Sequence, residues 1–389
     1  MRYAFRLAEL LGHNPDRRKR PGTIKAIVEH TGLDRHQVAS LLKNEAKYIP
    51  IEALSKLCDY LIDHGYATPS QLPGALFSIR AENFWELLAR RKQLELVVGI
   101  RQGEAAVNAE QAWVVASDSV LMGALLNGVS TLGGTARYLD MDLGSTTEQP
   151  KGSIEGPPQP EKLLQTLVWS PGYGSEAAVQ KRADYVFDTF SNSPGDKAMV
   201  CIGSVKSNPA VECMLSAAFG CEPFVSQDSV QNAMDRACPF FMKYRDFDPK
   251  PASSSAGVEL SQSQKVDQPG LWYESDNGEW VRAGGSENAD VAFVFYIFRE
   301  SLGRLDMVLS GFTGRATRYL AKTLLTRGEA FWPPVYEQPH VQVGAYVVEY
   351  ETDGIKSKSE DLLMTNVSAA AKITPMSRNA IERRLGNVN

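Results

Sequence analysis

Cysteine and histidine are both scarce in this sequence. The 389 residues include five cysteines and five histidines, and no two cysteines have the C-x-x-C spacing of zinc sites and redox motifs. An odd number of cysteines without paired spacing also argues against a disulfide framework. We therefore expect no metal site and no cofactor. Cys58 and Cys213 are predicted to be small core residues on apolar helix faces.

Long apolar runs are missing as well. No uninterrupted stretch reaches the roughly eighteen residues that a membrane-spanning helix requires. The first residues, MRYAFRLAELLG, are amphipathic and carry charges, which is unlike a secretory signal. We expect a cytoplasmic protein with no membrane partner, and the length predicts two or three domains.

Positive charge is concentrated near the start of the chain. The net charge is -5, yet residues 1–75 hold eleven lysines and arginines against eight acidic residues. The run DRRKRPGTIK at 16–25 has five basic residues and one acidic residue. A small basic region attached to an acidic remainder is suited to local contact with phosphates, and not to coating nucleic acid along its whole length.

Two short helical patterns flank a turn in IKAIVEHTGLDRHQVASLLKNE, residues 24–45. Apolar residues recur at helical spacing on both sides of Gly32, which predicts one apolar stripe on each helix. Thr23 and Asp34 are the predicted N-caps, and Gly32 can supply the positive φ of a tight turn. The remaining face of the second helix is polar, and such side chains can pair with base edges.

These residues resemble the Cro and phage-repressor type of helix-turn-helix domain. The similarity covers about residues 1–65, with a first helix from Tyr3 to Leu11 and a later helix in IEALSKLCDYLIDHG. Two features depart from the family: Val28 stands where a small residue is usual, and the basic loop 14–22 is long. The resemblance implies a homodimer that binds double-stranded DNA with the second helix in the major groove.

The resemblance assigns DNA contacts to two sets of residues. Those expected to face bases are Arg35, His36, Gln37, Ser40 and Lys43. Those expected to face phosphates are Arg17, Arg18, Lys19, Arg20, Thr23, Lys25 and Lys47. The alternative is a small helical docking module with a solvated polar face, and the basic loop favours DNA.

The remainder of the chain is predicted to be an α/β domain. A linker is predicted at 66–76, where proline and glycine are frequent and charges are few. Short apolar runs then precede turns and helical patterns, at 95–100, 112–117, 198–204, 291–298, 305–311 and 341–350. This alternation predicts a mostly parallel, doubly wound sheet in an α/β domain at 77–353. Asp-Asn-Gly in LWYESDNGEWVRAGG predicts an inserted β-hairpin, and residues 354–389 are predicted to form a polar tail.

Three strand-to-helix turns are candidate contacts for a ligand, since ligands of open α/β sheets bind beyond the carboxyl ends of the strands. Small residues and hydroxyls at a helix N-terminus favour phosphate or another anion. None of the turns is a known nucleotide fingerprint, and glycine and serine also serve packing and capping there. The candidate residues are Asp118 and Ser119; Gly203, Ser204, Lys206, Ser207 and Asn208; and Ser310, Gly311, Thr313, Gly314 and Thr317.

We interpret the chain as a DNA-binding transcriptional regulator, without catalytic residues, whose α/β domain senses a small anionic ligand of nucleotide type. The alternative is a nucleotide- or nucleic-acid-processing enzyme targeted by a DNA-binding head. Asn208 and Glu212 share a helix face and suggest such chemistry, although Glu212 is more typical of a solvated or capping carboxylate. A third interpretation is a scaffold that binds a protein partner through the hairpin.

Overall fold

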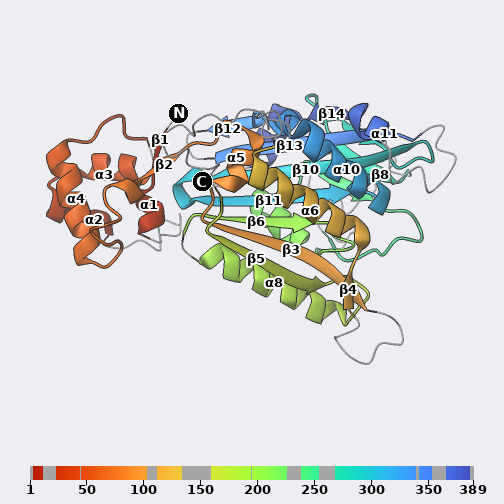
Figure 1. The fold of residues 1–389 in the computed structure, drawn as a ribbon, viewed down its shortest axis with the longest axis horizontal. Helices are drawn as coiled ribbons and strands as arrows, with labels where there is room; N and C mark the ends of the chain where they lie inside the picture. The colour runs from red at the N-terminus through yellow and green to blue at the C-terminus, as the bar shows by residue number, and fades with distance from the viewer. Residues whose placement is uncertain are drawn as a thin grey trace, which may run out of the picture.

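The computed structural model describes residues 3–11, 23–43, 45–102, 112–133, 159–193, 195–225, 238–253, 268–338, 341–352 and 365–385. These residues form a small helical head, up to residue 76, and a larger α/β body (Figure 1). The head lies at one end of the body, beyond the ends of several long strands.

The head is a cluster of short helices around one apolar core. Its described helices are α1 (Leu7–Leu10), α2 (Thr23–Thr31), α3 (Arg35–Leu42) and α4 (Ile51–Asp63). Each helix buries the apolar side of its sequence pattern, and Leu7, Ile27, Val38, Leu57 and Leu61 are fully buried. This burial, more than helix propensity, stabilises helices as short as these.

The turn between α2 and α3 confirms the local prediction. Gly32 has a φ of +73°, and nothing would crowd a Cβ there, so backbone conformation is the reason for glycine. The Asp34 carboxylate accepts hydrogen bonds from the backbone N–H groups of His36 and Gln37 at 2.7 and 2.8 Å. The Gln37 side chain in turn accepts from the Asp34 N–H at 3.1 Å, which completes a capping box.

The first helix is shorter than the prediction from Tyr3 to Leu11. Tyr3–Phe5 form a strand, β1, that pairs antiparallel with β2 (Phe77–Ile79). The rings of Phe5 and Phe77 meet edge-on at 5.4 Å, and a strand makes this contact where a helix could not. The prediction was wrong here because the pairing partner lies more than seventy residues further along the chain.

The segment 66–76, predicted to be a linker, is packed against the head. Ala67 and Leu76 belong to the apolar core of the head. Leu76, the last residue of the short helix η2 (Gly74–Leu76), is fully buried. The backbone N–H of Arg6 donates to the Leu76 carbonyl at 2.8 Å. The two ends of the head are therefore held to each other.

The body is organised around a nine-stranded sheet. Its order is β12-β13-β10-β11-β6-β3-β4, with β14 paired to β13 and β5 paired to β3. The bounds are β3 (Gln93–Gln102), β4 (Ala112–Val114), β5 (Lys162–Trp169), β6 (Lys197–Ile202), β10 (Ala289–Arg299), β11 (Arg304–Gly311), β12 (Tyr336–Gln338), β13 (Val341–Glu351) and β14 (Lys372–Pro375).

The sheet is mixed, so the predicted mostly parallel, doubly wound sheet is wrong. The strands β5, β3, β6 and β11 run parallel, whereas β10, β12, β13, β14 and β4 join by antiparallel pairing. A continuous apolar run shows only that a strand is buried on both faces. Direction depends on the connection: η6 (Glu300–Leu302) and Gly303 alone separate β10 from β11, and this connection is too short for a parallel crossover.

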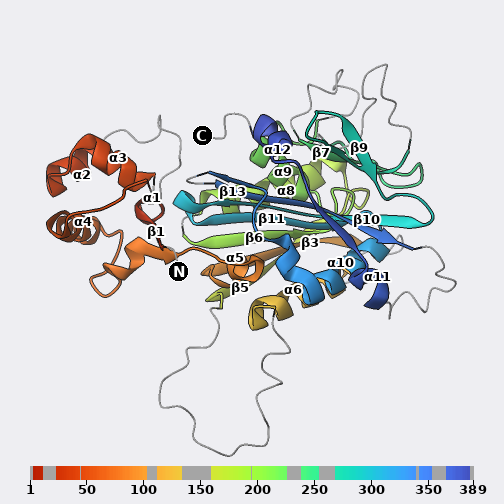
Figure 2. The ribbon, with the colours of Figure 1, turned by 90° about the horizontal axis from the view of Figure 1, so that it is seen from above.

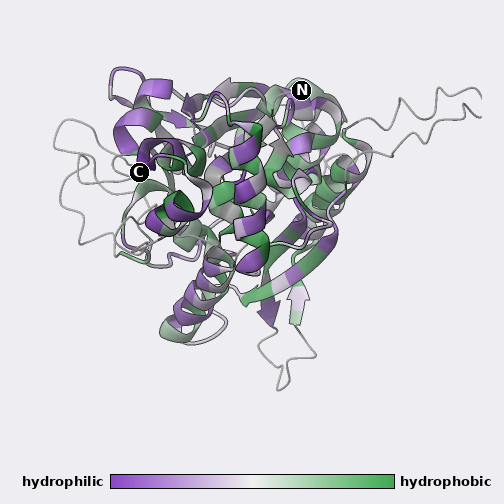
Figure 3. Ribbon diagram, turned by 90° about the vertical axis from the view of Figure 1, so that its left-hand side faces the viewer, coloured by the Kyte–Doolittle hydropathy of each residue, from purple (hydrophilic) through white to green (hydrophobic). Residues whose placement is uncertain are grey.

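Helices cover both faces of the sheet (Figure 2). One face carries α5 (Phe84–Ala89), α6 (Ala116–Thr131), α10 (Gly314–Arg327) and α11 (Thr365–Ala369). The other carries α8 (Glu176–Asn192), α9 (Ala210–Phe219), α12 (Arg378–Arg384) and a small sheet of β7 (Phe240–Lys243), β8 (Gly270–Glu274) and β9 (Trp280–Ala283). The helical ribbons alternate between hydrophilic and hydrophobic stretches, as helices packed on a core do (Figure 3).

The predicted hairpin is present as β8 and β9. Gly278 occupies its turn with a φ of +81°, and the Phe241 ring lies 5.0 Å from that of Trp280. The stretch predicted to be a polar tail also contributes to the body, because β14 extends the sheet. Arg384 of α12 donates to the buried Glu274 carboxylate at 2.8 Å.

Buried ion pairs join the head to the body. Arg6 of the head lies 3.6 Å from Asp196, and Arg91 donates to the second oxygen of that carboxylate at 2.6 Å. Arg80, just after β2, donates to Glu300 at 2.6 Å. Asp196 precedes β6 and Glu300 precedes β11, so this joint lies at the amino ends of the parallel strands.

Replacing Asp196 should destabilise the protein strongly. Asp196→Ala leaves Arg91, which is 3% exposed, without its carboxylate, and removing one partner of a buried pair costs about 3–5 kcal/mol. Urea unfolding followed by circular dichroism would measure the loss. Asp246→Ala is the control, since Asp246 is fully exposed beside Lys250 and should leave the unfolding curve unchanged. Equal curves for both variants would contradict the role given to the joint.

Candidate functional site

The helix α3 presents a polar face on the surface of the head. Its apolar residues point inward, where Val38, Leu41 and Leu42 are buried. Among the residues predicted to face bases, Arg35, His36 and Lys43 are exposed, and Gln37 and Ser40 are half-buried. The sequence pattern therefore leaves one continuous hydrogen-bonding face on a helix whose other face is held by the core.

Besides its predicted contact with a base, the Gln37 side chain takes part in the N-terminal cap of α3, which was not predicted from the sequence. Its Oε1 accepts the Asp34 N–H in the capping box, so the side chain is held against the start of α3. The orientation of the amide is thereby fixed, and its N–H₂ donors are not part of that bond. A side chain already held in one rotamer loses less entropy when it binds.

A groove of about 330 Å³ lies beside α3. It is lined by His36, Gln37 and Ser40 from the helix and by residues 45–50 from the following loop, including Lys47. Tyr48 stands at its rim with 79% of its surface exposed. The groove thus joins residues predicted to face bases with one predicted to face phosphate.

The other predicted phosphate contacts are only partly described. Lys25 is exposed on α2 and lies 3.7 Å from the Glu29 carboxylate. The helix α2 begins at Thr23, whose side chain is outside the described residues. Arg17, Arg18, Lys19 and Arg20 also lie outside the described residues.

The three candidate ligand turns meet at the opposite end of the body, at the carboxyl ends of the parallel strands. A Cβ on Gly203 would lie 3.4 Å from the Asp118 carboxylate, and one on Gly314 would lie 3.3 Å from the Ser117 hydroxyl. These short distances bring the first turn of α6 next to the turns that follow β6 and β11. Ser119 is exposed at the first turn of α6.

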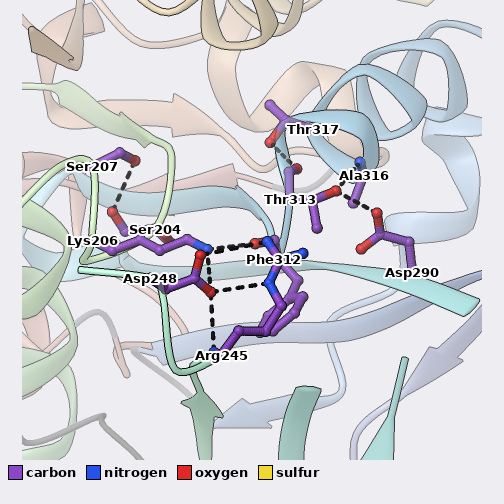
Figure 4. Close-up of polar contacts among 10 residues, drawn as sticks. All are labelled: Ser204, Lys206, Ser207, Arg245, Asp248, Asp290, Phe312, Thr313, Ala316 and Thr317. Atoms are coloured by element: carbon purple, nitrogen blue, oxygen red, sulfur yellow. Dashed lines mark hydrogen bonds and ion pairs between the residues drawn. The ribbon is translucent and has the colours of Figure 1, made fainter. Parts of the chain in front are cut away.

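Lys206 bridges two of these turns (Figure 4). Its ammonium donates to the Phe312 carbonyl at 2.9 Å and lies 3.2 Å from the Asp248 carboxylate. Arg245 approaches the same carboxylate at 3.3 Å. Burial lowers the pKa of Lys206, and the negative charge of Asp248 opposes that effect. In this arrangement the lysine holds the edge together, and an anion would have to compete with Asp248 for it.

Thr313 begins α10 and links it to the sheet. Its hydroxyl donates to the Asp290 carboxylate of β10 and accepts from the Ala316 N–H at 3.1 Å, as an N-cap does. Arg315 lies 3.5 Å from the same carboxylate. Thr317, one turn later, donates to the Thr313 carbonyl at 3.0 Å and is buried.

Several other candidate residues are buried or half-buried at the carboxyl edge of the sheet, where most of them make hydrogen bonds within the protein. Asn208 is fully buried and donates to the carbonyls of Val97 and Ile202. Ser207 donates to the Ser204 carbonyl at 3.1 Å, and Ser204 is itself buried. Ser310 is fully buried, and its hydroxyl has no hydrogen-bond partner among the described residues.

Gly311 has a packing role instead of a ligand-facing one. A Cβ there would lie 2.3 Å from the Thr317 backbone nitrogen, so only glycine allows α10 to begin so close to β11. The same reasoning applies to Gly99 of β3, where a Cβ would lie 1.8 Å from the Ser207 carbonyl oxygen.

Glu212, expected to be solvated or capping, is instead fully buried. Its carboxylate accepts from the Ser253 hydroxyl at 2.5 Å and from the Phe224 N–H at 3.3 Å. Sequence spacing alone could not show this burial, because the covering residues come from a distant segment. The carboxylate is engaged in holding that segment on α9.

A cavity of about 320 Å³, which the sequence analysis did not predict, lies at the same edge of the sheet. It lies between the turn 170–175, the start of α8 and the segment 249–251. Four prolines line it together with Glu176 and Lys250: Pro171, Pro209, Pro249 and Pro251. The Ser-Pro-Gly-Tyr-Gly-Ser turn after β5 was the available signal, since it is a fourth strand-to-helix turn rich in small residues.

Two features are absent from the part of the chain that the structure describes. No three His, Cys, Asp or Glu side chains are grouped closely enough to hold a metal ion there. Within the same residues, no helix combines the length and apolar character needed to cross a membrane.

Comparison with known families identifies the head. Residues 17–62 match the family model described as a Cro/C1-type HTH DNA-binding domain. Searches of curated proteins and of solved structures give no match. The match covers α2, α3 and α4 and includes the residues of α3 predicted to face bases.

Asp118 should make stability depend on pH. Burial raises its pKa from 3.8 to about 6, against the opposing effects of the Ser117 hydrogen bond and the charge of Arg101. A raised pKa means that the folded state favours the protonated acid. Its stabilising contribution is therefore complete below pH 3.8 and is lost as the pH rises through about 6. The difference between the two pKa values corresponds to a change of about 3 kcal/mol at most in the free energy of unfolding.

Asp118→Asn should remove this loss. Thermal unfolding at several pH values should show the variant gaining stability relative to the original protein as the pH rises from about 4 to about 7. Asp246→Asn, at an exposed carboxylate, should show a constant difference across that range. A constant difference for Asp118→Asn would mean that the carboxyl ionises as readily in the folded protein as in the unfolded chain.

Proposed function

We propose that this protein is a DNA-binding transcriptional regulator in which α3 reads base edges in the major groove. The observation that carries the proposal is the polar face of α3 within a head that matches the Cro/C1-type domain. Arg35, Gln37 and Lys43 have the donors and acceptors that discriminate bases, and in this proposal Lys25 and Lys47 contact phosphates. The basic run 16–25 adds sequence-independent attraction to DNA.

The proposal extends to a small anionic ligand, of nucleotide type, at the carboxyl edge of the body. Helices α6, α8, α9 and α10 all begin at this edge, and the positive ends of their dipoles favour an anion. Lys206 and Arg245 share one carboxylate, Asp248, so a phosphate could replace that carboxylate without leaving a cation buried alone.

Ligand and DNA would act on each other at a distance. The six residues of β6 separate the joint from the ligand edge by about 20 Å. A ligand at one end cannot touch the head at the other. It changes DNA affinity only if it binds one arrangement of the joint more tightly than another, and the coupling is then reciprocal.

The enzyme alternative has less support. It depended on Asn208 and Glu212, and both side chains are buried in hydrogen bonds that hold α9 and its neighbours. A carboxylate that acts on a substrate needs access to it, and Glu212 has none in this arrangement.

Gln37→Glu should test base reading without unfolding the head. Glutamate keeps the oxygen that accepts the Asp34 N–H but loses the amide donors, so the capping box remains. On a duplex selected from a randomised library, the preference over a scrambled duplex should fall about tenfold or more, since a bidentate pair contributes about 1–3 kcal/mol.

The matched control is Gln71→Glu. Gln71 also accepts a backbone N–H, from Thr68 at 2.9 Å, and the variant adds the same charge to the head. Fluorescence anisotropy should show the original preference for Gln71→Glu. If both variants lose preference equally, or neither does, α3 does not read bases through Gln37.

Lys206→Met should weaken ligand binding. Calorimetric titration with the four ribonucleoside monophosphates should show at least one saturable interaction, and the variant should bind that nucleotide tenfold more weakly or worse. Lys322→Met, at an exposed position on α10, is the control and should bind as the original protein does. Absence of binding by all four nucleotides would remove the nucleotide ligand and leave the DNA-binding proposal intact.

A further inference from the structure

We propose that the edge of the body formed by β5 and α8 is the contact surface for a second copy of this chain. The interface itself does not depend on the function of the head. It is inferred from a strand edge without a described partner, from exposed apolar side chains, and from two sequence patterns, each symmetric about its own central residue.

The strand β5 is the outer strand of the sheet on its side. It pairs with β3, and among the described residues no other strand pairs with it. Within the described part of the chain, the backbone N–H and C=O groups on its outer edge thus have no strand partner, and proteins commonly shield such an edge with charge, proline or a short strand. The eight residues of β5 include one charged residue, Lys162, and no proline.

Large apolar side chains are exposed beside this edge. Leu163 and Leu167 are 54% and 44% exposed, although their lateral neighbours Leu94 and Val98 on β3 are fully buried. Val120 of α6 is 50% exposed on the same face of the sheet. A group of exposed apolar residues next to an open strand edge is characteristic of a protein interface.

The sequence of β5 is self-complementary. On one face, Leu163 and Leu167 are placed symmetrically about Gln165. If β5 pairs antiparallel with β5 of a second copy about Gln165, each Leu163 faces a Leu167 and the two glutamines face each other. Such pairing makes an isologous contact with two-fold symmetry, and apolar cross-strand pairs stabilise it.

The helix α8 has a matching symmetry in its charges. Tyr185 is 61% exposed, and Arg182 lies over its ring at 5.6 Å. Arg182 comes three residues before Tyr185, and the exposed Asp188 comes three residues after it. Two copies of α8 crossing antiparallel at Tyr185 would therefore place each Arg182 beside an Asp188.

The proposal requires a single two-fold axis to serve both patterns. The strand β5 and the helix α8 each span about 25 Å, and α8 returns along the length of β5 between the parallel strands β5 and β6. Gln165 and Tyr185 both lie near the middle of their elements and so at about the same height.

The interface would send the two heads in opposite directions. Each head is fixed at the amino ends of its parallel strands, and antiparallel pairing of β5 reverses those strands. The ten residues of β3 alone span about 33 Å, and one head lies beyond each end of the dimer. Half-sites one helical turn apart could then not be occupied together, so, given DNA binding by the head, each dimer would hold two separate duplex segments.

Sedimentation velocity of the full chain tests the interface. The original protein should sediment as a dimer in the micromolar range, and the double variant Leu163→Glu with Leu167→Glu should sediment as a monomer with an unchanged melting temperature. Val281→Glu is the control, since Val281 is an exposed apolar residue on β9, and it should remain dimeric. A monomeric original protein, or a dimeric double variant, would overturn the proposal.

A charge reversal tests the proposed register. Arg182→Asp should weaken the dimer at least tenfold, and adding Asp188→Arg should restore it, which a merely destabilised fold would not do. Failure of the second change to restore the dimer rules out this pairing.

Two further outcomes distinguish this interface from an edge covered by the same chain and from a failure of the proposed DNA binding. A monomeric original protein whose stability falls on Leu163→Glu would mean that this chain covers its own edge, for instance with residues 134–158, which lie outside the described residues. Anisotropy on a duplex with one half-site should show that the monomeric variants still bind DNA. Loss of that binding in the original protein as well would concern the function of the head and not the interface.

Discussion

The placement of the head depends on one buried carboxylate. The Asp196 carboxylate accepts a hydrogen bond from Arg91 of the body and lies 3.6 Å from Arg6 of the head. All three side chains are buried. Neither arginine could leave the carboxylate without losing a partner that water cannot readily replace. Together with the pairing of β1 and β2, which form a small sheet of their own, this interaction attaches the head to the body. A fold with a free linker at the same place would let the head turn independently.

The consequence is a molecule with two separated ends. The polar face of α3 belongs to a head attached at the amino ends of β3, β6 and β11, and the turns rich in glycine and serine follow the carboxyl ends of the same strands. If the proposed ligand binds at the carboxyl edge and DNA binds at α3, the two lie at opposite ends of the strands and do not contact each other. What remains is a change in how the strands present their amino ends, carried by packed elements with two arrangements. Such a change would alter the ion pairs of Asp196 and Glu300, which lie at the amino ends of the parallel strands.

Local rules predicted the head well and the body only in outline. The turn at Gly32 and the cap at Asp34 depend on neighbouring residues, so the sequence reveals them. The strand β1 and the packing of Leu76 depend on partners far along the chain, so local rules predicted a helix in place of β1 and did not predict the burial of Leu76. The apolar runs marked the strands β10 and β13 but not their antiparallel direction. The candidate turns were found, whereas burial of Glu212 and Asn208 could be known only from their distant partners.

The rigidity of the joint and the symmetry of the β5 edge constrain each other. If the head could swing, a dimer through β5 could still bring two heads to adjacent half-sites. Arg6 joins the head to Asp196, and Arg80 holds the end of β2, the partner of β1, to Glu300. Both acidic residues lie just before parallel strands, so reversing those strands across a two-fold axis reverses the heads too. A dimer of this kind gains nothing from two half-sites on one straight duplex, and its avidity comes only from segments that the DNA itself can bring together. The spacing between operators, and not the spacing within one, would then determine how tightly the protein binds.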